Sequence, residues 1–175
     1  MNFPKTEREY PKDKRLKIII GGGIFFLIVV PYIFFFLSSP LARWLKVPDF
    51  SLNPSTLLIG ITISIGGLSL AFWTVIVQFA EGKGTPMPLA PTQKLITYGP
   101  YKYTRNPMAL GTSLYYIGIG ISLDSPSFLI ISIIAIILLL AYIKLFEEKE
   151  LEERFKEEYR KYKETAPFFI PIPKK

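Results

Sequence analysis

The sequence contains neither cysteine nor histidine among its 175 residues. Without cysteine there can be no disulfide and no thiol nucleophile, and without histidine there can be no Ser-His-Asp triad. The usual cysteine and histidine ligand sets for zinc are also missing, and we expect no metal site. Any enzymatic chemistry must therefore proceed without an imidazole that titrates near neutral pH.

Charged residues are nearly absent from four long segments, Leu16–Leu37, Thr56–Ala80, Met108–Leu123 and Phe128–Phe146. A transmembrane helix needs about 20 apolar residues, a length that only the third segment lacks. The short turn "DSPS" at 124–127 joins the last two segments into a hairpin. The sequence predicts an all-α integral membrane protein with about four transmembrane helices.

Lysine and arginine flank these segments unequally. They are concentrated before residue 16, in residues 81–107 and after residue 146, whereas the first connector carries only Arg43 and Lys46. Because cytoplasmic loops are enriched in these residues, both termini and Thr85 should face the cytoplasm and Asp124 the opposite side. The net charge of +7 suits anionic lipid headgroups, so the bilayer is the expected partner and nucleic acid is not.

These patterns divide one membrane domain into five parts. They are a cytoplasmic tail at 1–15, two transmembrane helices at 16–80, a cytoplasmic connector at 81–107, a helical hairpin at 108–146 and a C-terminal segment at 147–175.

Small residues recur within the apolar segments. Glycines 21–23 and 66–67 should let neighbouring helices approach closely. In the third segment Gly111, Tyr115, Gly118 and Ser122 follow helical spacing and form one stripe. We expect this stripe to pack against the fourth segment, and a flat ligand lying in the groove is the alternative.

The C-terminal segment begins with the strongly charged run "EEKELEERFKEEYRKYKE". Its apolar and aromatic residues share one helical face: Leu151, Phe155, Tyr159 and Tyr162. This predicts a cytoplasmic amphipathic helix that continues the fourth transmembrane helix. Glu147 and Glu148 precede that face, and at least one should point inward, where a carboxylate needs a partner. A solvated helix start is the alternative.

The connector at 81–107 is long for a loop without regular structure, and such loops are commonly functional. It opens with "EGKGTPMPLAP", whose glycines permit close backbone approach while prolines 86, 88 and 91 stiffen the chain. It ends at Asn106 and Pro107, favourable N-cap and N1 residues for the next helix. Arg105 beside that N-terminus predicts a site for a carboxylate or phosphate, and an ordinary lipid headgroup contact is the alternative.

Together, "GKGTPMPLAP", "LITYGPYKYTRNPMALG" and "FEEKELEERFKEEYRKY" followed by "FFIPIP" resemble the membrane methyltransferase superfamily. That group includes isoprenylcysteine carboxyl methyltransferases and phosphatidylethanolamine N-methyltransferases, and the resemblance covers Glu81 to Pro171. It implies transfer of a methyl group from S-adenosylmethionine, bound on the cytoplasmic side, to a lipophilic acceptor.

The resemblance also implies the site residues. The cofactor-binding residues that it suggests are Gly82, Gly84, Thr85, Gly99, Pro100, Tyr101, Arg105, Asn106, Pro107, Glu147 and Glu148. Arg105 and Glu147 are the expected catalytic pair, with Arg105 on the cofactor carboxylate and a glutamate on its amino group or ribose hydroxyls.

Two features of the resemblance point to different acceptors. Carboxyl methyltransferases commonly carry histidine at the position of Asn106, so "NPM" is closer to the phospholipid enzymes. The ending "FFIPIP" is closer to the carboxyl enzymes. An amine and a carboxylate therefore both stay open as acceptors. Two other hypotheses are a small membrane reductase of the sterol-reductase type and a non-catalytic four-helix membrane scaffold.

Overall fold

The computed structural model describes residues 11–48, 50–85 and 92–172. Lys5 and Arg8 of the tail and prolines 86, 88 and 91 of the connector lie outside these ranges. Every regular element in the described part of the chain is helical. The elements are α1 (Lys12–Ile24), π-turn η1 (Phe25–Val29), α2 (Val30–Leu45), α3 (Pro54–Ala80), 3₁₀-turn η2 (Gly99–Lys102), α4 (Pro107–Ser122), α5 (Pro126–Tyr142), π-turn η3 (Ile143–Glu147) and α6 (Glu148–Thr165).

Three continuous helices in the described ranges are long and apolar enough to cross a membrane: Lys12–Leu45, Pro54–Ala80 and Pro126–Thr165. They contain three of the four expected transmembrane segments. The remaining one, α4, has 16 residues. At 1.5 Å per residue it is about 24 Å long, shorter than the roughly 30 Å of a hydrocarbon core.

The first helix is longer than the predicted segment Leu16–Leu37. It starts at Lys12 and ends at Leu45. At its start the Arg15 guanidinium donates to the Phe79 carbonyl at 2.9 Å and lies 4.5 Å from the Phe79 ring centroid. This cation neutralises the exposed carbonyls at the end of α3, which is a favourable place for positive charge. The helix therefore gains a tertiary contact for residues that the sequence assigned to a tail.

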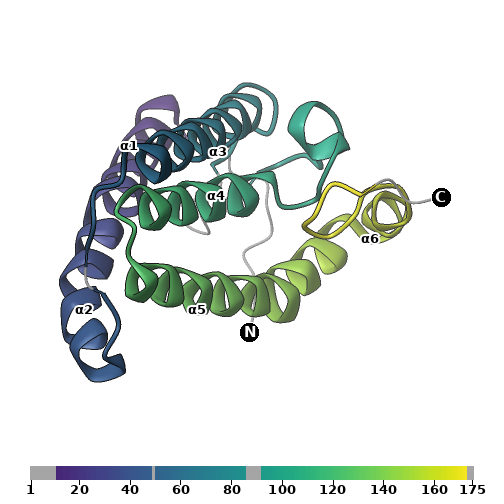
Figure 1. The fold of residues 1–175 in the computed structure, drawn as a ribbon. Helices are drawn as coiled ribbons and strands as arrows, with labels where there is room; N and C mark the ends of the chain where they lie inside the picture. Colours follow the sequence, from purple (N-terminus) through teal and green to yellow (C-terminus); the bar gives the residue numbers. More distant parts are fainter. Residues whose placement is uncertain (1–10, 49, 86–91, 173–175) are drawn as a thin grey trace.

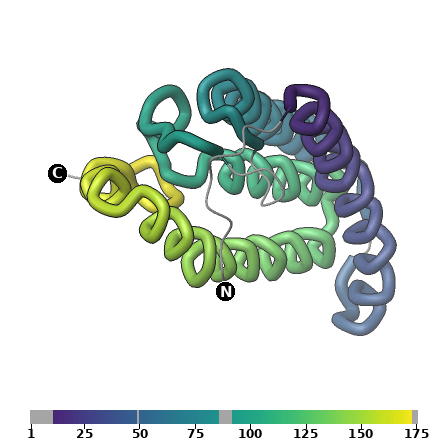
Figure 2. Tube along the Cα trace, turned by 180° about the vertical axis from the view of Figure 1, so that it is seen from behind, coloured from purple at the N-terminus to yellow at the C-terminus, as the bar shows by residue number. Residues whose placement is uncertain are grey.

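Helices α3 and α4 lie side by side in both views (Figures 1 and 2). Their contact is made by small residues, so closely that a Cβ atom on Gly67 would lie 2.5 Å from the Gly111 carbonyl oxygen. Gly60 and Gly118, each seven positions from the first pair, form the same kind of contact. The stripe of α4 thus packs against α3, and its predicted packing against the fourth apolar segment is wrong. The reason is that α3 carries the complementary row of small residues.

The other glycines of the apolar segments behave differently. A Cβ atom on Gly21, Gly23 or Gly66 would meet nothing within 4 Å, whereas Gly67 touches α4. The expectation of close packing is confirmed for one glycine of the 66–67 pair and wrong for Gly21 and Gly23. Adjacent helical residues point about 100° apart, so only one of two neighbours can face a given helix.

Tyrosine side chains of α4 complete the hydrogen bonding of the first helix around η1. The Val30 amide bonds to Phe25 in the π-turn and not to Phe26, and Pro31 has no amide hydrogen to offer Leu27. The Tyr116 hydroxyl donates to the Phe26 carbonyl at 2.8 Å, and the Tyr115 hydroxyl to the Leu27 carbonyl at 2.9 Å. Carbonyls in an apolar layer need such partners, so the two tyrosines allow the helix to deviate there.

Helices α4 and α5 form the predicted hairpin, although α5 already begins at Pro126, inside the expected turn. Near the turn, Tyr116, Phe34 and Phe128 form a buried aromatic cluster that joins α2, α4 and α5. The Ser51 hydroxyl donates to the Asp124 carboxylate at 2.9 Å, which brings the two short connectors together at this end. The Arg15–Phe79 contact marks the opposite end, where the long connector also lies.

Helix α6 follows α5 through η3 and turns away from the other helices (Figure 1). Tyr159 and Tyr162 are buried with Ile96 and Tyr101, and Leu151 and Phe155 pack against them. Helix α6 is not one regular helix, because Lys156 has φ 47° and ψ −120° and interrupts it. The break redirects the second half of α6 across the connector.

Candidate active site

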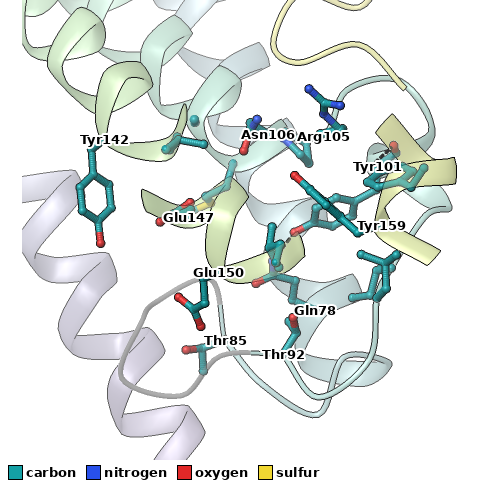
Figure 3. Close-up of a pocket in the computed structure, with 18 of the residues that line it drawn as sticks. Gln78, Thr85, Thr92, Tyr101, Arg105, Asn106, Tyr142, Glu147, Glu150 and Tyr159 are labelled. Atoms are coloured by element: carbon teal, nitrogen blue, oxygen red, sulfur yellow. Dashed lines mark hydrogen bonds between the residues drawn. The ribbon is translucent and has the colours of Figure 1, made fainter. Parts of the chain in front are cut away.

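A cavity of about 410 Å³ lies at the end of the bundle where the long connector, the start of α4, the end of α5 and the first turns of α6 meet. This size is typical of small-molecule sites. Figure 3 shows polar side chains from these separate segments arranged around it. Helices α4 and α5 contact each other near their shared turn, and at their other ends Ala109 and Leu139 line the cavity.

Six of the predicted site residues line this cavity: Thr85, Tyr101, Arg105, Asn106, Pro107 and Glu147. The other five do not line it: Gly82, Gly84, Gly99, Pro100 and Glu148. The structure therefore brings together side chains that are up to 62 positions apart. The glycines of "GKG" and "GPY" do not line the cavity.

The glycines outside the lining shape the chain path. A Cβ atom on Gly82 would lie 2.8 Å from the Thr92 side chain and 2.9 Å from the Gln78 carbonyl oxygen, so this site has room only for glycine. Gly99 has φ +62°, a conformation that residues with a side chain rarely adopt, and it starts the η2 turn. These glycines let the connector fold back on α3 and thereby place Thr92 and Tyr101 at the cavity.

Arg105 and Glu148 form a buried ion pair. An Arg105 guanidinium nitrogen lies 2.8 Å from Glu148 Oε1, and the two side chains are only 6% and 5% exposed. Lys144 binds the other carboxylate oxygen of Glu148 at 2.7 Å, and the Tyr159 hydroxyl donates to Oε1 at 3.3 Å. Two cations and one anion give this cluster a net positive charge, and Arg105 is its member that lines the cavity.

Glu147 is placed differently from its neighbour. Its side chain is partly buried and lines the cavity. Nothing in the described part of the chain donates a hydrogen bond to it or pairs with it. Glu147 ends the π-turn η3, and π-turns often occur at functional sites. Of the two predicted glutamates, Glu147 has its charge available for a ligand and Glu148 does not.

Asn106 occupies the N-cap position of α4 and Pro107 its first turn, but the Asn106 side chain makes no capping hydrogen bond. Its amide nitrogen instead donates to the Phe168 carbonyl at 2.8 Å. The expected capping by the side chain is therefore wrong, because the hydrogen bond from Nδ2 to Phe168 holds the side chain toward the segment after α6 and its oxygen caps no amide of α4. The first backbone amides of α4 have no side-chain cap, and Met108 and Ala109 line the cavity there.

Sequence reasoning missed several polar lining residues, above all Gln78, Glu150 and Arg154. Arg154 binds Glu150 at 3.2 Å and also donates to the Thr92 carbonyl, which joins α6 to the connector. Gln78 donates to the Tyr101 hydroxyl. The signal for Gln78 was its amide close to the end of an otherwise apolar segment, and the signal for Arg154 was its i,i+4 spacing from Glu150.

Burial raises the pKa of Tyr101 well above its usual value, so its hydroxyl stays neutral at physiological pH. Three buried polar atoms without a partner also belong to residues that line the cavity: Gln78 Oε1, Arg105 Nε and Arg154 Nε. Buried polar atoms are normally satisfied, so these three atoms leave hydrogen-bonding capacity unused beside the cavity. In the described ranges no group of histidine, cysteine, aspartate or glutamate could hold a metal ion.

Taken together, the cavity has an apolar part formed by membrane helices, including Phe26, Leu139 and Ile143, and a polar part with charges of both signs. Arg105 and the uncapped start of α4 favour an anionic group. The Glu147 carboxylate favours a cationic one. The arrangement suits a zwitterionic ligand next to an apolar one.

Residues 55–158 match the model of a family described as phospholipid methyltransferase. The match contains α3, the connector, η2, α4, α5 and most of α6, which supply nearly all of the cavity lining. Comparisons with curated proteins and with solved structures found no match. The family match favours the methyltransferase hypothesis over the reductase and scaffold hypotheses. Because it covers more than half of the 175 residues and three helices can span a membrane, this integral membrane protein belongs to the phospholipid methyltransferase family.

Proposed function

We propose that this protein transfers a methyl group from S-adenosylmethionine to a lipid or lipid-modified acceptor in the membrane. The observation that supports this most strongly is the cavity itself, which places Arg105 and an unpaired Glu147 next to apolar helices. An acceptor with a hydrophobic chain needs the apolar part, and a charged methyl donor needs the polar part.

The polar and aromatic side chains that line the cavity fit S-adenosylmethionine. Its amino-acid end carries a carboxylate and an ammonium group, and Arg105 and Glu147 are the complementary charges. Gln78 lines the cavity and its Oε1 has no protein partner, so its amide would hydrogen-bond with ribose hydroxyls or with the adenine amino group. The rings of Tyr101 and Tyr142 provide aromatic surface in the same lining, which attracts cations.

When bound, S-adenosylmethionine supplies an electrophilic methyl group on a sulfonium centre, and such a displacement depends on alignment more than on acid–base assistance. The residues of this chain therefore act by holding and excluding. Arg105 and Glu147 would orient the methyl donor. Phe26, Leu139 and Ile143 would keep water from the apolar part and contact the hydrophobic chain of the methyl acceptor. A chain without histidine or cysteine is sufficient for these tasks.

The proposed orientation places the cavity at the cytoplasmic side, with both termini and the connector facing the cytoplasm. It rests on the lysine and arginine asymmetry of the sequence, and α4 is a fourth, short membrane helix in this arrangement. The acceptor carries either an amine, as in a phospholipid headgroup, or a carboxylate, as in a lipid-modified cysteine.

The proposal is tested with the detergent-purified full chain and S-adenosylhomocysteine, the product analogue of the donor. We expect binding in the micromolar range, about −8 kcal/mol, measured by calorimetry and by a rise in melting temperature. NADPH serves as the control and should produce no change. Binding of NADPH without any response to S-adenosylhomocysteine would favour a membrane reductase and refute the proposal.

A further inference from the structure

Residues that follow α6 are hydrogen-bonded to the residues that precede α4. The Arg105 amide donates to the Pro167 carbonyl at 2.9 Å. The Phe168 carbonyl accepts from the Asn106 side chain at 2.8 Å and from the Thr104 hydroxyl at 3.2 Å. These three hydrogen bonds join two segments that are about 60 positions apart in the sequence.

Side chains reinforce this contact around Arg105. The Phe168 ring centroid lies 5.9 Å from the Arg105 guanidinium carbon and 5.0 Å from Lys144 Nζ, within the range of cation–π attraction. The Lys163 carbonyl accepts from the Arg105 guanidinium at 3.4 Å. Arg105 is therefore held by Glu148, by the end of α6 and by the segment beyond it.

The segment itself is well packed. Ala166 is 1% exposed and belongs to the buried cluster with Tyr101, Tyr159 and Tyr162. Exposure returns immediately afterwards, since Ile170 is 60% exposed. The ordered contact is thus confined to residues 166–168, and these lie beyond residues 55–158, which the family model matches.

We propose that residues 166–168 form a clasp that positions Arg105 and the start of α4, and that Asn106 is the positioning residue that closes it. The Asn106 Nδ2 donates to Phe168, and the side chain makes no competing hydrogen bond to the first turn of α4. The contact is independent of any ligand, whereas its consequence for donor binding rests on the proposed function.

A cysteine at position 166 reports the clasp directly, because the chain has no cysteine of its own and Ala166 is buried. We compare the rate of maleimide labelling of Ala166→Cys in the full chain with and without Asn106→Asp, which keeps the shape of the side chain and removes its donor. Loss of a hydrogen bond to a buried carbonyl should accelerate labelling about tenfold. A cysteine at the exposed position 165 should react at the same rate in both backgrounds.

Two further variants separate the clasp from general destabilisation. Thr104→Val removes the second donor to Phe168 and also the acceptor of the Asn106 backbone amide, with little change in side-chain shape, and should also accelerate labelling at 166. Asn53→Asp makes the same chemical change at the exposed N-cap of α3, far from the clasp, and should leave labelling at its parent rate. Asn106→His keeps an N–H donor and should restore slow labelling.

The functional consequence is measured as the dissociation constant for S-adenosylhomocysteine. Asn106→Asp and Thr104→Val should each weaken binding several-fold, and Asn106→His should restore it. Parent-like labelling in both donor-deficient variants, or faster labelling with unchanged affinity, would overturn the inference. If the parent itself fails to bind S-adenosylhomocysteine, the proposed function is wrong, and labelling at position 166 alone then decides whether the clasp exists.

Discussion

The two adjacent glutamates show how different the surroundings of neighbouring residues can be. Glu147 faces the cavity without a protein partner, whereas Glu148 is 5% exposed at its side chain and binds both Arg105 and Lys144. The sequence motif treats them as a pair. Their contacts leave the Glu147 carboxylate without a partner at the cavity and join Glu148 to Arg105 and Lys144.

This difference predicts that glutamine at position 147 affects ligand binding, whereas glutamine at position 148 affects stability. Glu147→Gln should weaken S-adenosylhomocysteine binding by roughly 1.5–3 kcal/mol, the value of a charged hydrogen bond, at an unchanged melting temperature. Glu148→Gln should lower the melting temperature clearly, because breaking a buried ion pair costs about 3–5 kcal/mol. Calorimetry and thermal unfolding of the purified variants provide both measurements.

Glu153→Gln, on the exposed side of α6, is the matched control and should change neither quantity. If Glu147→Gln binds like the parent while Glu148→Gln loses affinity at full stability, the two roles are reversed and the assignment of Glu147 is wrong.

At the level of elements, the contact between α3 and α4 depends on which residues of each helix are small. Gly67 lies against the backbone of Gly111, while the adjacent Gly66 faces open space. Helices in a membrane associate through such close approach because lipid offers no hydrophobic driving force between them. The start of α4, and with it Arg105, is positioned by this contact.

The two glycines therefore predict different outcomes for an alanine. Gly67→Ala would place its Cβ atom 2.5 Å from the Gly111 carbonyl oxygen, so the helices must separate and the melting temperature in detergent should fall. Gly66→Ala meets nothing within 4 Å and should raise stability by up to about 1 kcal/mol, the helix propensity difference. Equal melting temperatures for both variants would contradict the observed packing of α3 on α4.

At the level of the whole molecule, the cavity and the short connectors lie at opposite ends of the bundle. The hydrogen bond between Ser51 and Asp124 marks one end, and the contact of Arg15 with Phe79 marks the other. The cavity at the connector end is lined by connector residues and by residues of helices that can span a membrane. This placement suits an enzyme whose two substrates arrive from different phases.

The orientation in the membrane can be tested with single cysteines at exposed positions on the two ends of the helix bundle. Thr85 is only 2% exposed and would report poorly, so Lys102→Cys and Leu52→Cys, both at exposed positions, are better choices. With a membrane-impermeant maleimide, Leu52→Cys should label in intact cells and Lys102→Cys only after permeabilisation. The reverse pattern would invert the proposed orientation, and labelling of both from one side would contradict the arrangement of the helices. The cysteine-free parent measures background.

Several features of this protein could be predicted from the sequence because they depend on neighbouring residues. Apolar runs of sufficient length form helices in a membrane whatever surrounds them, and the turn before Pro126 must produce a hairpin. The spacing from Leu151 to Tyr162 defined the inward face of α6. The motif of Arg105, Asn106 and Pro107 was recognisable in the sequence, and all three residues line the cavity.

Contacts between distant segments required the tertiary structure. Complementary small residues on α3 decided the partner of the α4 stripe, and a carbonyl at Phe168 decided the role of Asn106. The pairing of Arg105 with Glu148 left Glu147 as the available carboxylate. Sequence periodicity states which residues share a face, but the partner of that face depends on the shape and hydrogen-bonding groups of another segment, and only the folded chain brings the two together.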